Sequence, residues 1–198
     1  MAERTGTGDP LRTIALLWRT GVKTGRSGLT LDAVVETAIT VAAEVGIDNL
    51  SMRRIADRLG VGAMSLYTHV PGKAELIDLM VDHVNGTLYR DADAIPAGLG
   101  WRSGMETVAE RNWRLFSEHR WLLGVDVVRP PLGPGTTAKY DAELSPLLGI
   151  GLDDVEVDQV LGLVLEHVRS AARLALGAAE TSRATGSSEQ EWWERAGP

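Results

Sequence analysis

The sequence contains no cysteine, and this absence excludes several kinds of chemistry. Without thiols the chain forms no disulfides, binds no zinc or iron–sulfur cluster through cysteine, and has no cysteine nucleophile. Long apolar runs are also missing: the densest one, residues 160–165, is broken by Gly162 and followed by Glu166. A membrane-spanning helix needs roughly 18 to 20 apolar residues. Because the first residues do not resemble a secretory signal either, we expect a cytoplasmic protein with no membrane partner.

The remaining composition is typical of a folded globular chain, with 198 residues of which 44% are hydrophobic and 24% charged. The net charge of −7 is unevenly distributed. Residues 1–75 hold nine Lys/Arg and eight Asp/Glu, whereas residues 76–198 hold eleven and nineteen. A nearly neutral first part and an acidic remainder predict two regions with different partners. The overall negative charge therefore does not exclude DNA as a partner of the first region.

Apolar residues recur at spacings of three and four through most of the chain, and no segment shows the sustained alternation of a half-buried strand. This pattern predicts an all-α fold. Thr30 and Ser51 are suitable N-caps for the first two helices, and Gly46 and Gly60 are suitable ends. Residues 180–190 are polar and predict a loose connection. The expected helices cover residues 31–45, 52–59, 63–69, 73–88, 101–119, 136–148 and 153–179.

Residues 1–29 are expected to form a flexible basic arm, because glycines interrupt the segment and leave room for about one helical turn near residues 11–18. Two interpretations of the arm stay open, a solvated tail or a segment that enters the minor groove of DNA. Residues 30–75 and 76–198 are expected to form two helical domains. The cations of the arm include Arg12, Arg19, Lys23 and Arg26.

Two short helices joined by a glycine turn are predicted within residues 51–69, which is the pattern of a helix-turn-helix. Ala56 is small enough for the helices to approach closely, and Gly60 suits the left-handed conformation of the turn. Val61 would fill the angle between the helices, and Leu66 would hold the second one down. With Leu66 inside, the outward residues of the second helix are Ala63, Met64, Ser65, Tyr67 and Thr68.

These outward residues suit the major groove of DNA, since hydroxyls exchange hydrogen bonds with base edges and apolar groups contact the thymine methyl. On the preceding helix, Arg53 is long enough to bind a guanine edge, whereas Arg54 and Arg58 would reach phosphates. Lys73 begins the next helix, where open backbone N–H groups and a cation favour a phosphate. Tyr67 and His69 can donate hydrogen bonds to the same strand of the DNA backbone. A purely structural role for either residue stays open.

At these residues the sequence resembles the tetracycline-repressor (TetR) family of bacterial regulators. The resemblance is carried by the contiguous run 50–73, with its Leu-Tyr-x-His-Val core and its final Lys73. It implies a homodimer that binds double-stranded operator DNA through an N-terminal three-helix domain, followed by a larger helical domain for ligand binding and dimerisation. The positions that it places against bases are Arg53, Ala63, Met64, Ser65, Tyr67 and Thr68, and those against phosphates are Ser51, Tyr67, His69 and Lys73.

The resemblance extends into the second domain, where residues 119–121 and 129–134 are similar to the ligand domain of the tetracycline-repressor subgroup. Two departures limit what it implies. Residues 125–128 hold no histidine where the subgroup binds its metal–drug complex, so we expect no metal and no other cofactor. The family also closes its dimer with a final long apolar helix that this sequence lacks, so either the chain is truncated or its dimer contact is smaller.

A small, largely apolar effector is expected in the second domain, because ring side chains gather where helices would enclose a pocket. The longest apolar helix is interrupted by Glu166, His167, Arg169 and Arg173, and one or more of them facing a cavity would bind a polar group of the effector, with Glu166 and His167 as the candidates. Core packing explains most such groups of rings, and a solvent-facing position would explain the four polar residues equally well. The aromatic candidates are Trp113, Phe116, Trp121 and Tyr140.

Three function classes remain. A ligand-responsive repressor accounts for both domains. A ligand-free architectural or regulatory DNA-binding protein accounts for the helix-turn-helix and leaves the acidic second domain without a role. An all-helical enzyme is the weakest alternative, because the four histidines are scattered and no metalloprotease or nucleophile-elbow motif is present. We therefore expect a regulator that is not an enzyme.

Overall fold

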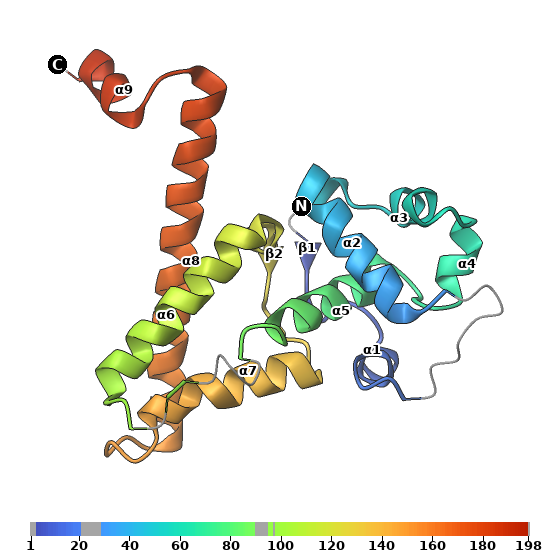
Figure 1. Ribbon diagram of the computed structural model, residues 1–198. Coiled ribbons are helices and arrows are strands. Elements are labelled where there is room, and N and C mark those ends of the chain that lie inside the picture. Colours follow the sequence, from blue (N-terminus) through green and yellow to red (C-terminus); the bar gives the residue numbers. More distant parts are fainter. Residues whose placement is uncertain (1–2, 21–28, 90–94, 97, 198) are drawn as a thin grey trace.

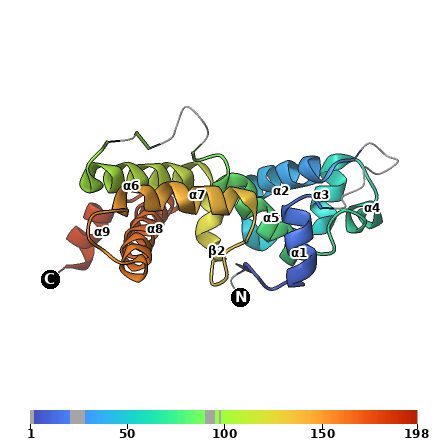
Figure 2. The ribbon, with the colours of Figure 1, turned by 90° about the horizontal axis from the view of Figure 1, so that it is seen from below.

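The computed structural model describes residues 3–20, 29–89, 95, 96 and 98–197, which form two helical lobes joined by α5 (Lys73–Asn85) (Figures 1 and 2). The first lobe contains α1 (Pro10–Leu17), α2 (Leu31–Val45), the 3-10 turn η1 (Ile47–Asn49), α3 (Met52–Leu59) and α4 (Ala63–Tyr67). The second contains α6 (Trp101–Glu118), η3 (Arg120–Gly124), α7 (Pro134–Leu144), η4 (Ser145–Leu147), α8 (Asp154–Thr185) and α9 (Glu189–Ala196). A short parallel pair joins β1 (Glu3–Arg4) to β2 (Val125–Asp126). The prediction of an all-α fold is confirmed, with this pair as the addition.

The first lobe follows the capping signals of the sequence closely. The Thr30 side chain accepts a hydrogen bond from the Ala33 N–H at 3.1 Å and begins α2, and Ser51 caps α3 in the same way at the Arg54 N–H. Gly60 ends α3 in the left-handed conformation, with φ 67° and ψ 28°. This turn sets α4 against α3 over the fully buried Leu66, as the sequence predicts.

The second lobe is built around α8: α6 packs obliquely across the first part of α8, whose later turns extend beyond α6 (Figure 1). Asp153 begins α8 with a capping box, in which its carboxylate accepts from the Glu156 N–H and the Glu156 carboxylate accepts from the Asp153 N–H. The main hydrophobic core runs without a break from α2 through α5 to Val168 on α8. A smaller core lies between the far ends of α6 and α8. The two lobes therefore share one core at their junction.

Helix α5 is buried on nearly all sides, since it packs against α1 and α2 in one lobe and α7 in the other. Its acidic side chains Glu75, Asp78 and Asp82 are all buried, which is unusual for carboxylates. Backbone N–H groups compensate for their burial. Asp78 accepts from the N–H of Gly6 at 2.9 Å, and Asp82 accepts from Thr136 at 2.8 Å, at the positive N-terminal end of α7.

The N-terminal segment differs from the flexible arm that the sequence predicts for residues 1–29. Asp9 caps α1 by accepting from the Arg12 N–H. Pro10 occupies the first turn, where the backbone N–H that proline lacks would have no partner within the helix. Leu17 then anchors α1 in the core. Segment 3–20 is thus folded against α5 and β2, while Lys23 and Arg26 lie outside the described residues.

At the other end of the chain, α8 continues to Thr185, beyond the helix predicted for residues 153–179. The expected loose connection over 180–190 shrinks to three residues, because Gly186 ends α8 in the left-handed conformation and Ser188 caps α9 at once. Among the described helices, none is both long and apolar enough to cross a membrane.

Candidate nucleic-acid interface and ligand cavity

The outer face of α4 is exposed as the helix-turn-helix pattern predicts. Met64 is 77% exposed and Tyr67 46% exposed, while Leu66 between them is fully buried. Thr68 is exposed as well, and Ala63 and Ser65 are partly buried at the edges of the same face. Side chains of this face would meet a DNA groove without any rearrangement of the core.

The arginines of α3 fall into two groups. Arg53 and Arg54 are exposed and form no ion pair within the described part of the chain. Arg58, which the sequence suggested as a phosphate ligand beside Arg54, is bound to both carboxylate oxygens of Glu44 on α2. This contact lowers the pKa of Glu44, chiefly through the hydrogen bonds from Arg58. Arg58 therefore joins α3 to α2 and is less available to DNA than its neighbours.

The remaining polar positions of the motif have local partners. Ser51 is occupied as the cap of α3, and the Thr68 hydroxyl donates to the Ser65 carbonyl oxygen at 2.7 Å. His69 is half-buried directly after α4. Lys73 is engaged most strongly, because its Nζ lies 2.6 Å from Oε1 of Glu3 and 3.3 Å from the carbonyl oxygen of Ile47. A DNA phosphate would have to replace the Glu3 carboxylate at this lysine.

A groove beside α4 brings α1 to the same surface. It is lined by Arg12 and Leu16 of α1, by Tyr67 and Thr68 at the end of the outer face of α4, and by His69. The Arg12 guanidinium has no hydrogen-bond or ion-pair partner among the residues described. The first lobe thus presents a cation from the N-terminal segment next to the proposed phosphate positions, although as part of a helix rather than a loose arm.

The second lobe contains a cavity of about 170 Å³ between α5, α6, α7 and α8. Of the effector residues expected from the sequence, Phe116 and Glu166 line it. Arg169, one of the polar residues expected to interrupt the longest helix, lines it as well, whereas Asn112 and Lys139 were not anticipated. The full lining consists of Val81, Asn85, Asn112, Leu115, Phe116, Leu122, Val127, Lys139, Leu165, Glu166 and Arg169.

A buried polar network forms one wall of this cavity. Glu143 is almost fully buried and accepts hydrogen bonds from Tyr89 at 2.9 Å, Asn112 at 2.6 Å and Lys139 at 2.6 Å. Burial, reinforced by the charge of Glu143, raises the pKa of the Tyr89 hydroxyl. Because every member has a partner, the network holds Asn112 and Lys139 in fixed positions at the cavity.

Arg169 also lines the cavity and connects the cavity to β2 at the lobe junction. Its guanidinium lies 5.9 Å from the ring centroid of Phe116 and donates to the carbonyl oxygens of Leu122 and Val125. Burial lowers the pKa of this group. The sequence signal was the group of polar residues that interrupts this apolar helix, Arg169 among them, but the facing partners of Arg169 could not be identified from it.

The other expected effector residues do not line the cavity. Trp113 is exposed, because the neighbouring Asn112 faces inward and successive helix residues are rotated by about 100°. Tyr140 is exposed and donates to Asp158 on α8 at 2.6 Å, and His167 is exposed on α8. Trp121 is buried in the main core beside α2 and η1.

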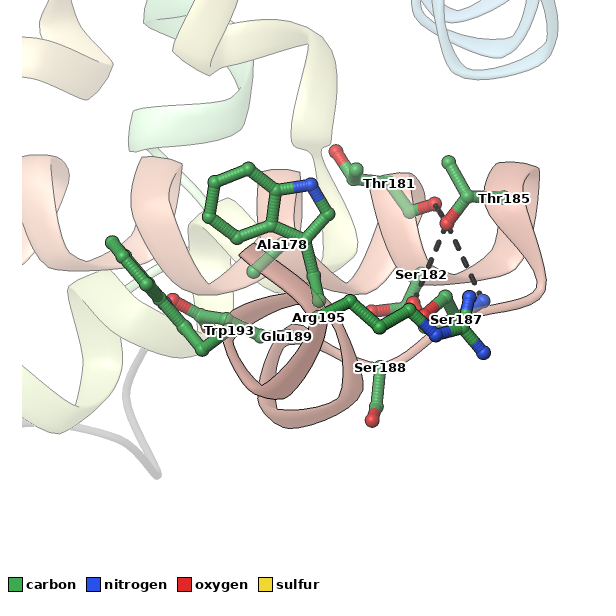
Figure 3. A pocket seen from close by; sticks show the side chains of 10 residues that line it. Ala178, Thr181, Ser182, Thr185, Ser187, Ser188, Glu189, Trp193 and Arg195 are labelled. Atoms are coloured by element: carbon green, nitrogen blue, oxygen red, sulfur yellow. Dashed lines mark hydrogen bonds between the residues drawn. The ribbon is translucent and has the colours of Figure 1, made fainter. Parts of the chain in front are cut away.

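A second hollow, of about 530 Å³, lies between the end of α8 and α9 (Figure 3). Ala178, Thr181 and Ser182 line it from α8, and Trp192, Trp193 and Arg195 from α9. Both tryptophans are largely exposed and contact each other edge to face at 4.9 Å between centroids. Because it lies at the outer end of α8, away from α5, this hollow has no direct connection with the helix-turn-helix.

An exposed helix-turn-helix joined through one buried helix to a second, cavity-bearing lobe defines a DNA-binding regulator. The family model of bacterial regulatory proteins of the tetR type matches residues 34–80, and that of the tetracyclin repressor-like C-terminal domain matches residues 96–197. The chain therefore belongs to the TetR family of transcriptional regulators.

Individual relatives agree with this assignment. The HTH-type transcriptional repressor DrrR1 of Streptomyces coeruleorubidus is 41% identical over 194 residues, covering 96% of this chain and 71% of the relative. The class C tetracycline repressor protein of Escherichia coli is 30% identical, covering 71% of this chain and 67% of the relative. Among solved structures, ActR of Streptomyces coelicolor in complex with actinorhodin superposes with a TM-score of 0.67 at 31% identity, covering 76% of this chain and 70% of that one.

Proposed function

We propose that this protein is a repressor that binds operator DNA as a homodimer and releases it when a small molecule occupies the second lobe. One observation carries the proposal: a single helix takes part in both sites. Helix α5 begins with Lys73 beside the helix-turn-helix, and its last turns supply Val81 and Asn85 to the cavity. A change in cavity shape would therefore act on the base of the DNA-binding lobe.

On the DNA side, paired α4 helices of a dimer would enter successive major grooves roughly 34 to 36 Å apart, the spacing of one helical turn. Arg53 and the outer face of α4 would contact base edges. The DNA backbone would be bound by Ser51, Arg54, Tyr67, His69 and Lys73, with Arg12 as an additional phosphate ligand.

On the effector side, the cavity suits a small, largely apolar molecule with a polar group that faces Asn112, Lys139 or Arg169. ActR, a similar protein of the same family, has been solved in complex with a ligand, actinorhodin. An effector that prefers the DNA-incompetent dimer about a hundredfold shifts the equilibrium by roughly 2.7 kcal/mol per site. No step of this switch requires a metal, and we place its action in the cytoplasm, where bacterial operators lie.

The DNA half of the proposal is tested on a duplex selected from random sequence by the purified protein. Tyr67→Ala and Lys73→Ala should weaken binding to all duplexes and reduce its salt dependence. Arg53→Ala should instead relax discrimination at one base pair by about 1 to 3 kcal/mol. Unchanged affinity in all three variants, measured by gel-shift titration, would exclude this surface as the DNA site.

The effector half is tested by screening metabolites and drugs for thermal stabilisation, followed by release of the selected duplex. Phe116→Ala and Arg169→Gln should abolish the response to a releasing compound, whereas Trp192→Ala, in the outer hollow, should leave it intact. Compounds that stabilise the protein equally with and without DNA would favour the alternative of a regulator without ligand control.

A further inference from the structure

Strand β1 connects the proposed phosphate-binding lysine to the effector lobe. Glu3, in this strand, pairs in register with Val125 of β2 and at the same time binds the ammonium group of Lys73 at 2.6 Å. The next residue, Arg4, lies 3.7 Å from the carboxylate of Asp126, and the Thr5 N–H donates to the Asp126 carbonyl oxygen at 3.1 Å. The N-terminal strand thus touches both functional regions within three residues.

The Glu3–Lys73 ion pair is more than a contact between two freely solvated groups. The two side chains are 28% and 27% exposed, and Lys73 donates in addition to the Ile47 carbonyl oxygen. A carboxylate at 2.6 Å neutralises the local charge that would attract a phosphate and occupies the place of its oxygen. DNA and Glu3 therefore compete for one ammonium group.

The position of Glu3 depends in turn on a side chain of the cavity. Val125, its register partner, accepts a hydrogen bond through its carbonyl oxygen from Arg169, which lines the cavity and lies over Phe116. An unbroken series of contacts leads from the cavity through Arg169, β2 and β1 to Lys73. On the side of α5, Asp78 and Glu75 hold the segment after β1 through the N–H groups of Gly6 and Asp9.

We propose that Glu3 is a positioning residue that withholds Lys73 from the DNA backbone, and that pairing of β1 with β2 sets this state. DNA binding requires Lys73 to exchange the Glu3 carboxylate for a phosphate. An effector that strengthens the contact between Arg169 and β2 favours the withheld state. This inference rests on the proposed DNA-binding role of the first lobe and adds the residue that controls one of its contacts.

The central test is a double-mutant cycle between Glu3→Gln and Lys73→Gln, with affinity for the selected duplex measured at fixed salt. Glu3→Gln should raise affinity roughly three- to fivefold, which corresponds to the upper part of the range for a partly exposed ion pair. In the Lys73→Gln background the same substitution should change affinity less than about twofold. Asp48→Asn, which removes an exposed acid next to Ile47, controls for the general loss of negative charge.

The outcomes separate the inference from the proposed function. If Lys73→Gln weakens binding but Glu3→Gln does not raise it, or raises it equally in both backgrounds, the competition is absent and the inference is wrong. If Glu3→Gln lowers both the thermal midpoint and the affinity, Glu3 supports DNA binding structurally and the inference is also wrong. If the parent protein selects no duplex from the random pool, the proposed function itself fails.

A second measurement follows the strand directly. Thr5→Pro deletes the N–H that donates to Asp126 and should raise duplex affinity as Glu3→Gln does. In the parent protein, addition of the selected duplex should accelerate amide hydrogen exchange at Thr5 and Gly6. The reason is that β1 loosens when a phosphate replaces the Glu3 carboxylate at Lys73. Equal or slower exchange at these two amides in the DNA complex would overturn the proposal.

Discussion

Asp78 is 1% exposed, and its burial raises the pKa of its carboxyl group to about 6, with the Gly6 N–H opposing and Glu75 reinforcing the shift. In the unfolded chain the same group titrates near 3.8. Well below pH 3.8 the residue is protonated in both states and carries no penalty. As the pH rises, the unfolded state loses its proton first, so stability falls until the folded group has ionised above about pH 6.

Asp78→Asn should therefore remove a pH dependence while it keeps an oxygen that accepts from Gly6. We expect the free energy of unfolding of the variant, relative to the parent, to rise by about 2 kcal/mol between pH 4 and pH 7. Urea denaturation at the two pH values measures this difference. Asp57→Asn, on the exposed side of α3, serves as the control: its free energy of unfolding relative to the parent should be the same at both pH values. Parallel behaviour of Asp78→Asn would show that its carboxyl group ionises normally.

Glu143 offers a second prediction at this scale. Glu143→Ala removes the common acceptor of Tyr89, Asn112 and Lys139 and leaves a lysine that is 11% exposed without its counter-ion. We expect a loss of about 3 to 5 kcal/mol in the free energy of unfolding. The double variant Lys139→Met with Glu143→Leu should lose much less, because no charge stays buried. Chemical denaturation of both variants checks the comparison; equal losses would contradict it.

The limits of sequence reasoning are clearest at single residues of α6. Its apolar spacing correctly predicted a helix and the burial of Phe116, but an aromatic stripe also suggested that Trp113 faces inward. The structure turns Asn112 inward instead, because a buried acceptor, Glu143, lies 31 residues away in the chain. A partner that distant is invisible to a local pattern, so Asn112 and Lys139 could not be predicted as cavity residues, whereas Glu166 and Arg169 on α8 could.

At the scale of elements, the turn between α3 and α4 makes a direct prediction. Gly60 has a φ of 67°, whereas Gly62 has φ −68°, and a Cβ at either position would meet no atom within 4 Å. Backbone conformation alone separates them. We expect Gly60→Ala to cost about 1 to 2 kcal/mol in the free energy of unfolding and Gly62→Ala less than about 0.5 kcal/mol. Thermal or urea denaturation measures both, and equal costs would argue against a strained turn.

Helices of the first lobe were predictable because their caps and apolar faces are local. Thr30, Ser51 and Gly60 fix the ends of α2 and α3 within a few residues of sequence. The β1–β2 pair was not, since each strand has two residues and they are about 120 positions apart. The glycine-rich segment before α1 predicted a loose arm because α5, whose carboxylates bind its N–H groups, comes some 70 residues later.

At the scale of the whole molecule, α8 presents an apolar face that no described residue covers. Leu163 and Leu174 are 73% and 72% exposed and lie eleven residues apart, about three helical turns, on one side of the helix. A dimer contact on this face would bury them. Leu163→Glu with Leu174→Glu should therefore shift the protein toward monomer without lowering its thermal midpoint, as checked by analytical ultracentrifugation.

The same double variant should lose at least about tenfold in affinity for the selected duplex, because a monomer contacts only one half-site. Leu132→Glu is the matched control, since Leu132 is also exposed but lies in the segment before α7. A dimer that survives both substitutions on α8 would place the contact elsewhere.

Besides the shared core, α5 is attached to α7 through main-chain donors, and this has a consequence for how the sequence can diverge. Asp82 binds the N–H groups of Gly135 and Thr136, which any residue other than proline would supply. Neighbouring side chains of α7 can thus be replaced over generations while this attachment persists. Gly133 and Gly135 are the exceptions, because a Cβ at either one would overlap Asp82. Across natural variants, these two glycines and Asp82 should be inherited as a unit, while their neighbours drift toward new effectors.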